Sequence, residues 1–578
     1  MEKQGDIKKS EVVDGAIPWY KNETFLLAFL FSGLCLCASQ LTLPGSTGPV
    51  IQLDNVIPDR LLTQLRGGTP PPTRSVASEE FTDDHRFEAL LQDTDAFSGP
   101  VLLARAPVEK IPNEAVGNVG ILKRPLFPLI ADSFMAGSAA SSKLSRFQQE
   151  NASLHHALNK RLSKLGCNNE ALVLPCLEIS TDGQCKRKAL DSFFFHLRRV
   201  ALGRAASPAR LSWFGDSLTA GDGFTGELRR LFQGQFGDGG HGFLPMRPPA
   251  RFMGFQGAHV SYRGQWDVET LLVRKEPRPL GLMGAAFRRP RGASIKYRTR
   301  DENRHFDMLG VLWSAPDGTA TVTLSWPGRE QPLIQTLGGL ADKPHVAWIK
   351  LNNENDGEIN ELDIRGFSPR ATYYGVMVER SGPGVVVDNL GIIKGRAPLL
   401  LRNEREHFQT VLELRGTHLG VFFYGVNFAT LGMPGPKRLA RYRDRYAEVL
   451  TTARGPRSQR DCLVLSILTR GERGQQGVHH RASVGPLANT QQEAALKAGC
   501  AFWNMYKVMG GADGVKSWFN RPKRLIGTDL AHPTGQGYRY LARRLYLALL
   551  WAFDDYLQRG LPPSPLCTGG ECYRCQRK

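Results

Sequence analysis

Residues 210–232, RLSWFGDSLTAGDGFTGELRRLF, place an apolar strand, a turn at Gly215 and a helix in direct succession. Two later stretches repeat this order. LGVFFYGVN precedes a helix expected from about Arg438, and DCLVLSIL precedes a helix expected from about Thr490. Alternation of buried strands with helices is typical of a parallel α/β sheet. The sequence therefore predicts an α/β domain.

The segment from about Arg251 to Arg380 has a different pattern. In TATVTLSW, apolar and polar residues alternate, and ASIKYRTR does the same. VAWIKL, ELDIRGF and YYGVMVER add further short apolar runs between turn residues. Period-two alternation indicates strands with one buried face. We expect residues 251–380 to form a β-sandwich inserted into the α/β domain, whose two parts would be residues 167–250 and 381–560.

Composition and charge narrow the range of functions. The 578 residues are 41% hydrophobic, which excludes a wholly disordered, collagenous or polytopic membrane protein. The net charge of +19 predicts attraction to an anionic polymer, a phosphate-bearing membrane or a nucleic acid. Zinc-finger spacing, a P-loop and basic runs interleaved with aromatic residues are all missing from the sequence, so we expect no nucleic-acid partner.

The N-terminal region contains one long apolar run. Residues 25–43, FLLAFLFSGLCLCASQLTL, carry no charge. As a helix this run would be about 28 Å long, enough to cross a bilayer once. The preceding lysines favour a cytoplasmic tail at residues 1–24, and we expect an uncleaved signal-anchor, with cleavage near Cys37 as the alternative. The rest of the chain would then be membrane-anchored and extracytoplasmic, in the periplasm if the host is Gram-negative.

The composition of residues 44–166 indicates a linker, followed by a region of unknown role that is partly helical. Apolar residues recur there at steps of three and four, which predicts an amphipathic helix. This spacing is more typical of an ordinary packed helix than of a coiled coil. The residues that define it are Leu144, Phe147, Asn151, Leu154, Leu158, Leu162 and Leu165.

Cysteines beyond the anchor can form disulfides in an oxidising compartment. Cys176 and Cys185 flank the short loop PCLEISTDGQC, and we predict that they are bonded. The polar tail, residues 561–578, contains Cys567, Cys572 and Cys575. This triplet lacks a fourth ligand for zinc, so disulfides or free thiols are favoured over a metal site. For the chain as a whole we expect neither a metal nor a cofactor.

Three polar motifs stand at strand ends or before a helix. Ser217, in the Gly-Asp-Ser turn, would lie in the crevice at the carboxyl end of a strand. Asp529 and His532 are spaced so that the carboxylate can reach one imidazole nitrogen, leaving the other to accept a serine proton. Asn427 follows LGVFFY and could aim its amide into the same crevice. Taken singly, each motif is more typical of a turn, a helix cap or a strand end.

Together, and in this order, these motifs resemble the GDSL/SGNH hydrolase superfamily. The similarity is greatest to the bacterial peptidoglycan O-acetylesterase branch, which has an inserted carbohydrate-binding-like domain. ALDSFFFHLRRV and GVMVERSGPGVVVDNLGI are further matching stretches. The resemblance implies a flavodoxin-like parallel sheet, with Ser217 as nucleophile, His532 as general base and then acid, and Asp529 orienting His532. The N–H of Ser217 and the amide of Asn427 would form part of the oxyanion hole.

The sequence departs from the family at the glycine that supplies another oxyanion N–H. The chain reads GIIKGR over residues 391–396. An ungapped match places Lys394 at the glycine position, whereas one inserted residue restores Gly395, the residue that we assign. Lys394 could serve only if it adopts the required dihedral angles. Phe428 stands where the family often has an acidic residue.

Three further residues lie close to these motifs in the sequence. Asn504 either replaces a family Asp or is a structural turn residue, and the second reading is favoured. His241 could touch substrate, but an exposed loop histidine is the more typical case. Asp216 is expected to hold the turn together through backbone N–H groups.

The sequence thus favours a serine esterase that removes O-acetyl groups from peptidoglycan or another polysaccharide. Two alternatives stay open. The same triad could transfer the acetyl group to a sugar hydroxyl, or the chain could be a catalytically silent glycan-binding protein.

Overall fold

The computed structural model describes residues 137–165, 172–248, 253–273, 275–301, 303–352, 357–429, 432–455, 460–475 and 477–559. The expected signal-anchor at residues 25–43, most of the region that follows it and the cysteine-containing tail lie outside these residues. In the described part of the chain, no helix has both the length and the apolar character needed to cross a membrane.

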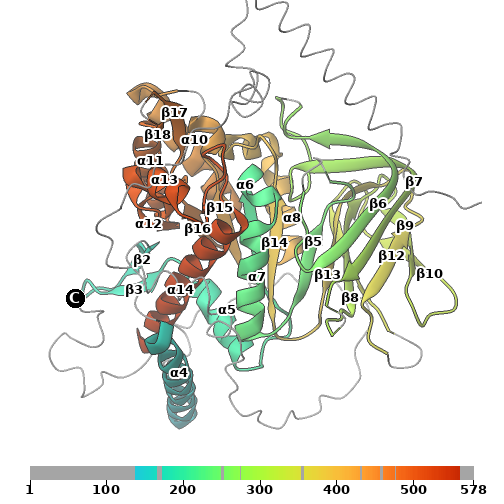
Figure 1. Ribbon diagram of the computed structural model, residues 1–578. Helices are drawn as coiled ribbons and strands as arrows, with labels where there is room; N and C mark the ends of the chain where they lie inside the picture. The colour runs from blue at the N-terminus through green and yellow to red at the C-terminus, as the bar shows by residue number, and fades with distance from the viewer. Residues whose placement is uncertain are drawn as a thin grey trace, which may run out of the picture. The chain divides into compact units, whose positions relative to one another are not determined.

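A six-stranded sheet forms the centre of the α/β domain (Figure 1). Its order is β1-β19-β16-β15-β4-β14, and only the edge strand β1 is antiparallel to its neighbour. Numbered by appearance in the chain, the five parallel strands have the order 2-1-3-4-5, as in flavodoxin. The predicted parallel sheet is therefore confirmed. The strands are β1 (Leu172–Val173), β4 (Ala209–Gly215), β14 (Val385–Gly391), β15 (Leu419–Phe423), β16 (Asp461–Leu465) and β19 (Ala501–Trp503).

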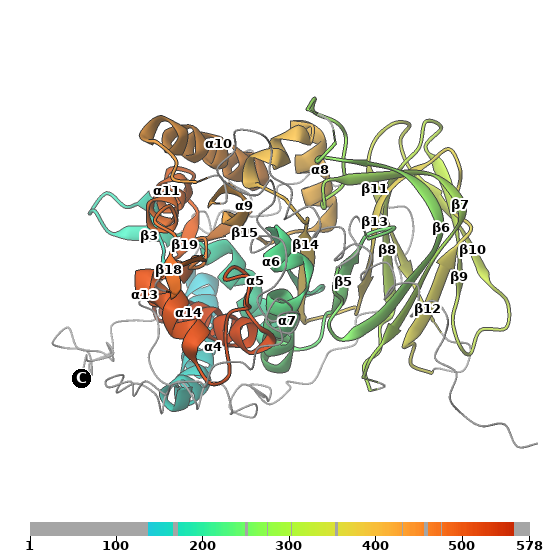
Figure 2. The ribbon, with the colours of Figure 1, turned by 45° about the horizontal axis from the view of Figure 1, so that its top comes forward.

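Helices cover both faces of this sheet, which explains why nearly every residue of its five parallel strands is buried. One face packs against α5 (Asp191–Ala201), α7 (Gly223–Phe236) and α14 (Gly535–Arg559). The other face packs against α8 (Arg405–Arg415), α10 (Pro436–Arg454) and α11 (Val484–Lys497). Figure 2 shows the two groups on opposite sides of the strands.

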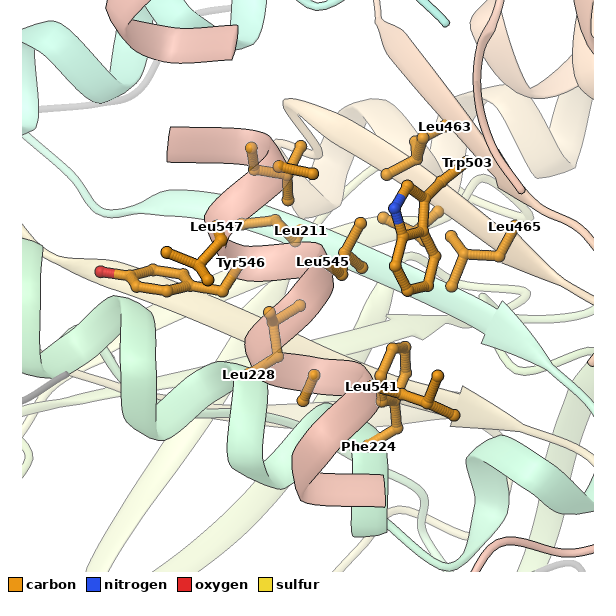
Figure 3. Close-up of a cluster of buried hydrophobic side chains, with 14 of the residues drawn as sticks. Leu211, Phe224, Leu228, Leu463, Leu465, Trp503, Leu541, Leu545, Tyr546 and Leu547 are labelled. Carbon is orange, nitrogen blue, oxygen red and sulfur yellow. The ribbon is translucent and has the colours of Figure 1, made fainter. Parts of the chain in front are cut away.

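The core beneath α14 is built from long side chains of both layers (Figure 3). Leu541 and Leu545 of α14 lie among side chains of α7 and of the sheet, and Trp503 fills the space near β16. Leu545 and Trp503 are almost completely buried. Burial of such side chains is the main free-energy gain that holds a helix on a sheet.

The N-terminal helix of the described chain is α4 (Gly137–Leu165), which packs against α14. Its apolar face buries Leu154, Leu158 and Leu162. Asn151 is also buried, and its Nδ2 donates to the carbonyl oxygen of Leu557 at 3.2 Å. The predicted amphipathic helix is confirmed, and it is an ordinary packed helix because its partner is another helix of the same domain.

The segment between residues 251 and 380 forms eight strands of a second, antiparallel sheet, and β5 adds the ninth strand. Its order is β10-β9-β12-β7-β13-β8-β11, with β5 on β13 and β6 on β7. The predicted change from strand-helix alternation to a region of β-strands is confirmed. The strands are β5 (Gly240–Leu244), β6 (Ala258–Thr270), β7 (Ala285–Thr299), β8 (Met308–Ser314), β9 (Thr319–Ser325), β10 (Leu333–Gly338), β11 (His345–Lys350), β12 (Glu361–Arg365) and β13 (Thr372–Glu379).

The nine strands form one barrel-like sheet, where we expected the two separate sheets of a sandwich. The physical reason is the long strand β7, which changes partners along its length. It pairs with β6 throughout, with β12 near its end, and with β13 at Phe287 near its start. Register shifts in β6 between Arg263 and Asp267 accompany this change. Such bulges bend a strand and let a sheet curl.

A buried group of charged side chains joins the two sheets. Arg415 of α8 is completely buried, and its guanidinium lies 2.8 Å from Asp388 of β14 and 2.7 Å from Glu379 of β13. Arg210 of β4 pairs with Glu379 at 2.7 Å. Asp388 also accepts the backbone N–H of Phe243 in β5 at 2.9 Å. Buried charges require such partners, so this cluster fixes how the antiparallel sheet sits on the parallel one.

Two disulfides are present among the described residues. Cys176 and Cys185 are bonded, as predicted, and join β2 (Cys176–Ile179) to β3 (Cys185–Lys188). A second bond, not foreseen from the sequence, links Cys462 to Cys500. These two residues are 38 positions apart and become neighbours only because β16 pairs with β19.

Candidate active site

The site lies where the chain order of the parallel strands reverses, at the carboxyl ends of β4 and β15. Open α/β sheets bind their ligands at this position. Ser217 begins the short helix α6 (Ser217–Ala220), directly after β4. The turn before it is tight, because a Cβ on Gly215 would lie 2.0 Å from Oγ1 of Thr219. Glycine is thus required two residues before Ser217.

Asp216 stabilises this turn from inside. Its side chain accepts the backbone N–H of Leu218 at 3.0 Å, so it acts as the N-cap of α6. The expected structural role of Asp216 is confirmed by this contact. Burial raises the pKa of Asp216 to about 7, although hydrogen bonds from the backbone of Leu218 and Gly425 act in the opposite direction.

Ser217, His532 and Asp529 form a continuous chain of polar contacts. Oγ of Ser217 lies 2.9 Å from Nε2 of His532, and Nδ1 of His532 lies 2.5 Å from Oδ2 of Asp529. The other oxygen of Asp529 accepts the backbone N–H groups of Ala531 at 3.2 Å and His532 at 3.1 Å. The structure therefore brings together these three residues, which lie 315 positions apart at the widest.

The loop that carries Asp529 and His532 is closed by its own backbone. It connects α13 (Gly511–Asn520) to α14, and a bridge pairs Ile526 with Pro533. The N–H of Gly527 donates to the carbonyl oxygen of His532 at 2.7 Å. The loop is also held from β17 (Gly471–Gly474), because the N–H of Gly471 donates to the carbonyl oxygen of Leu530 at 2.9 Å.

The electrostatics of the loop suit a histidine that accepts a proton. Partial burial raises the pKa of Asp529, but hydrogen bonds from His532 and Ala531 outweigh this and hold it below its ordinary value. An ionised Asp529 favours the tautomer of His532 with the hydrogen on Nδ1. Nε2 is then left to accept the proton of Ser217. The site is shallow, since the side chains of His532 and Asp529 are 42% and 52% exposed.

Asn427 approaches from the neighbouring strand. It lies in α9 (Val426–Ala429), after β15, and its Nδ2 donates to the carbonyl oxygen of Gly395 at 2.9 Å. The structure thus brings Asn427 to the turn that follows β14. That turn is also hydrogen-bonded to the end of β4, because the N–H of Ile392 donates to the carbonyl oxygen of Gly215 at 2.9 Å.

The turn at residues 392–395 distinguishes the two possible oxyanion donors. The N–H of Gly395 donates to the carbonyl oxygen of Ile392 at 2.8 Å, so it is used within the turn. Lys394 has a φ of 65°, in the left-handed region that favours glycine. Its N–H donates to no backbone carbonyl in the described part of the chain. Gly395 therefore contacts Asn427 through its carbonyl oxygen only. Of the two candidate oxyanion donors, Lys394 is the one whose N–H is not used in a backbone hydrogen bond within the turn.

His241 is not in an exposed loop, contrary to expectation. It lies in β5 and is 7% exposed, with its ring centroid 5.7 Å from that of Tyr297. Burial holds the pKa of His241 well below its ordinary value, and Arg229 and Arg304 lower it further. The glycine-rich sequence around it is typical of a loop, but pairing of β5 with β13 makes it a strand.

Two other residues near the sequence motifs have structural contacts. Asn504 caps α12 (Met505–Val508) by accepting the N–H of Lys507 at 2.9 Å, which confirms the reading as a turn residue. Phe428 packs against Tyr442, with ring centroids 4.4 Å apart.

Sequence reasoning missed Arg470, which follows β16 at the same edge of the sheet. Its Nη1 donates to the carbonyl oxygen of Val426, next to Asn427, at 2.7 Å. Its charge also acts on Asp529 and Asp216. A charged residue two positions after the apolar stretch DCLVLSIL was the available signal.

No family model and no curated protein matches this sequence. Among solved structures, a peptidoglycan O-acetylesterase is similar with a TM-score of 0.51 and 21% identity, covering 63% of this chain and 96% of that chain. An acetyl xylan esterase has a TM-score of 0.23 and 14% identity, covering 28% of this chain and 80% of that chain. A salicylyl-acyltransferase from a tetracycline biosynthetic pathway has a TM-score of 0.23 and 11% identity, covering 52% and 95%. The first similarity shows a shared fold, and the other two are too remote to add to it.

Proposed function

We propose that this protein is a serine esterase of the SGNH type that removes O-acetyl groups from peptidoglycan or another polysaccharide. The observation that carries the proposal is the contact chain from Ser217 through His532 to Asp529 at the switch point of the sheet. The fold shared with a peptidoglycan O-acetylesterase supports the same reading.

In the proposed reaction, Oγ of Ser217 attacks the carbonyl carbon of the acetyl group and its proton moves to Nε2 of His532. Asp529 stabilises the imidazolium that results. The tetrahedral intermediate collapses as the bond between the acetyl carbon and the sugar oxygen breaks. His532 gives its proton to that oxygen, which leaves as the sugar hydroxyl, and the acetyl group stays on Ser217. Water then attacks this ester with His532 as base, and acetate is released.

The oxyanion of each tetrahedral intermediate needs donors that are already in place. We assign this role to the backbone N–H of Ser217, the side-chain amide of Asn427 and the backbone N–H of Lys394. Lys394 is preferred to Gly395 because the N–H of Gly395 donates to Ile392 within the turn.

The exposure of the site favours hydrolysis over acetyl transfer. Transfer to a sugar hydroxyl requires that water be kept from the acetyl-enzyme, whereas the side chains of His532 and Asp529 are 42% and 52% exposed. An open site also suits a polymer, which could cross it without threading into a cavity.

We also propose that the catalytic part lies outside the cytoplasm, anchored through residues 25–43. The disulfides at Cys176–Cys185 and Cys462–Cys500 support an oxidising compartment. Protease digestion of sealed cells, followed by detection of each terminus, would test this topology.

Hydrolysis of p-nitrophenyl acetate and release of acetate from O-acetylated peptidoglycan test the activity directly. The full chain should act on both, Ser217→Ala should not, and Ser261→Ala, an exposed serine on β6, should match the wild type. If a folded Ser217→Ala variant keeps wild-type activity, the esterase proposal fails and glycan binding without catalysis becomes the better reading.

A further inference from the structure

Positively charged side chains from several segments surround the candidate active site. Lys394 and Arg396 are exposed in and just after the turn that follows β14. Arg473 of β17 (Gly471–Gly474) donates to the carbonyl oxygen of Thr528, next to Asp529, at 3.3 Å. Arg481 donates to the carbonyl oxygen of Ala429, in the helix that carries Asn427, at 3.0 Å.

Nearby carboxylates do not balance these charges. Glu472 pairs with Arg481 at 3.2 Å, and Asp529 is held by His532. Among the residues that the structure describes, Lys394, Arg396 and Arg473 form no ion pair with a carboxylate, and Arg473 contacts the carbonyl oxygen of Thr528 and the ring of Phe519. We define the rim of the site by Lys394, Arg396, Arg473 and Arg481; even with Glu472 and the ionised Asp529 counted against them, this rim keeps a net positive charge.

The backbone of Lys394 points to a role for its side chain. A residue with a Cβ in the left-handed region carries a conformational cost that glycine avoids. Non-glycine residues held in such conformations cluster at functional sites. Here the cost is carried by an exposed lysine whose backbone N–H we assigned above as an oxyanion donor.

We propose that the substrate is an acidic O-acetylated glycan, with a carboxylate close to the acetylated sugar. This inference rests on the proposed esterase function and adds the substrate class. Arginine can bind a carboxylate through two parallel hydrogen bonds, and lysine contributes a point charge. Cations at a rim also attract an anionic polymer before it docks, which raises the rate of association.

A matched pair of substrates tests the charge alone. The full chain is assayed on an O-acetylated oligogalacturonide and on the same oligosaccharide after reduction of its carboxyl groups to alcohols. We expect kcat/KM to be about tenfold higher for the acidic form at low ionic strength. The difference should shrink in about 0.5 M salt, because salt screens exposed charges.

Variants then locate the effect. Arg473→Gln and Arg396→Gln should each lower the ratio of the two kcat/KM values about two- to fivefold, as expected for exposed ion pairs. Arg298→Gln, on the exposed face of β7, is the matched control and should leave the ratio unchanged. Peptidoglycan fragments with and without their stem peptides distinguish peptide carboxylates from ring uronates as the source of the negative charge.

Equal kcat/KM values for the acidic and reduced oligosaccharides, without salt dependence, would overturn the inference while leaving the esterase proposal intact. If the full chain hydrolyses none of the three substrates, neither the two oligosaccharides nor p-nitrophenyl acetate, the proposed function is overturned instead. The two failures are therefore distinguishable in one set of assays.

Discussion

Every residue of β15 and β16 in the parallel sheet is buried, whereas β9 of the antiparallel sheet alternates between buried and more exposed positions. Helices cover both faces of the parallel sheet, so only the ends of its strands reach solvent. The antiparallel sheet keeps a solvated face. The difference explains why Ser217 and Asn427 both follow parallel strands: those ends are where polar groups can be exposed on a rigid frame.

The largest expected effect tests whether the edge of the parallel sheet carries the chemistry. Ser217→Ala or His532→Ala should each lower kcat/KM by up to about a million-fold, and the double variant should be scarcely worse. A nucleophile without its base is already inactive, so the losses should not add. Steady-state kinetics on an aryl acetate measure all three variants, and additive losses would contradict a single catalytic unit.

Removing the charge that joins the two sheets should cost stability. Arg415→Met leaves Asp388 and Glu379 buried without their shared cation, and the free energy of unfolding should fall by roughly 3–5 kcal/mol. Urea denaturation measures this, with Arg298→Met on an exposed face as control. A loss below about 1 kcal/mol would show that the sheets are held together mainly by apolar contacts.

The core of the antiparallel sheet should affect stability without affecting chemistry. Leu324 is fully buried in β9, and Leu324→Ala should lower the free energy of unfolding by roughly 2–5 kcal/mol. Under conditions where the variant stays folded, kcat on an aryl acetate should be unchanged. A large fall in kcat would mean that the two sheets are less separate in function than their structures indicate.

At the edge of the parallel sheet, Asn427→Ala should lower kcat about a hundred- to a thousand-fold. The substitution removes one of several oxyanion donors and leaves the nucleophile and its base intact. Asn504→Ala, which removes the cap of α12, serves as the control and should leave kcat nearly unchanged. Similar kcat values for both variants would contradict the role assigned to Asn427.

The smallest effect concerns pH and the buried carboxyl below Ser217. The pKa of Asp216 is about 7 in the folded chain, against an ordinary value of 3.8. Between these values the folded state holds a proton that the unfolded state has lost, so this group's contribution to stability decreases as pH rises. Asparagine does not ionise. The stability of Asp216→Asn relative to wild type should therefore increase from pH 5 to pH 8 in urea denaturation, and a constant difference would contradict the raised pKa.

Patterns within short stretches predicted much of this architecture. Strands β4, β15 and β16 follow from apolar runs that precede helices. The antiparallel region and helix α4 follow from the period of their apolar residues, because each period reflects the geometry of a single element. The bond between Cys176 and Cys185 follows from their closeness in the chain. The resemblance to the GDSL/SGNH superfamily led to the hypothesis of one catalytic site, formed by Ser217, Asn427, Asp529 and His532.

Contacts between distant segments could not be predicted in this way. Cys462 and Cys500 meet only through the pairing of β16 with β19, and His241 is buried only because β5 joins the antiparallel sheet. The curl of that sheet depends on bulges and partner changes in its longest strands. None of these leaves a periodic signal in the sequence.

The sequence by itself determined which residue types stand at the ends of the parallel strands and in the Asp-His loop. Only the tertiary structure decided their geometry: the 2.9 Å contact between Ser217 and His532, the use of the Gly395 N–H within its turn, and the φ of 65° at Lys394. The physical reason is that a side chain's chemistry is local, whereas the position of one donor relative to another depends on the packing of β4, β14 and β15 against each other.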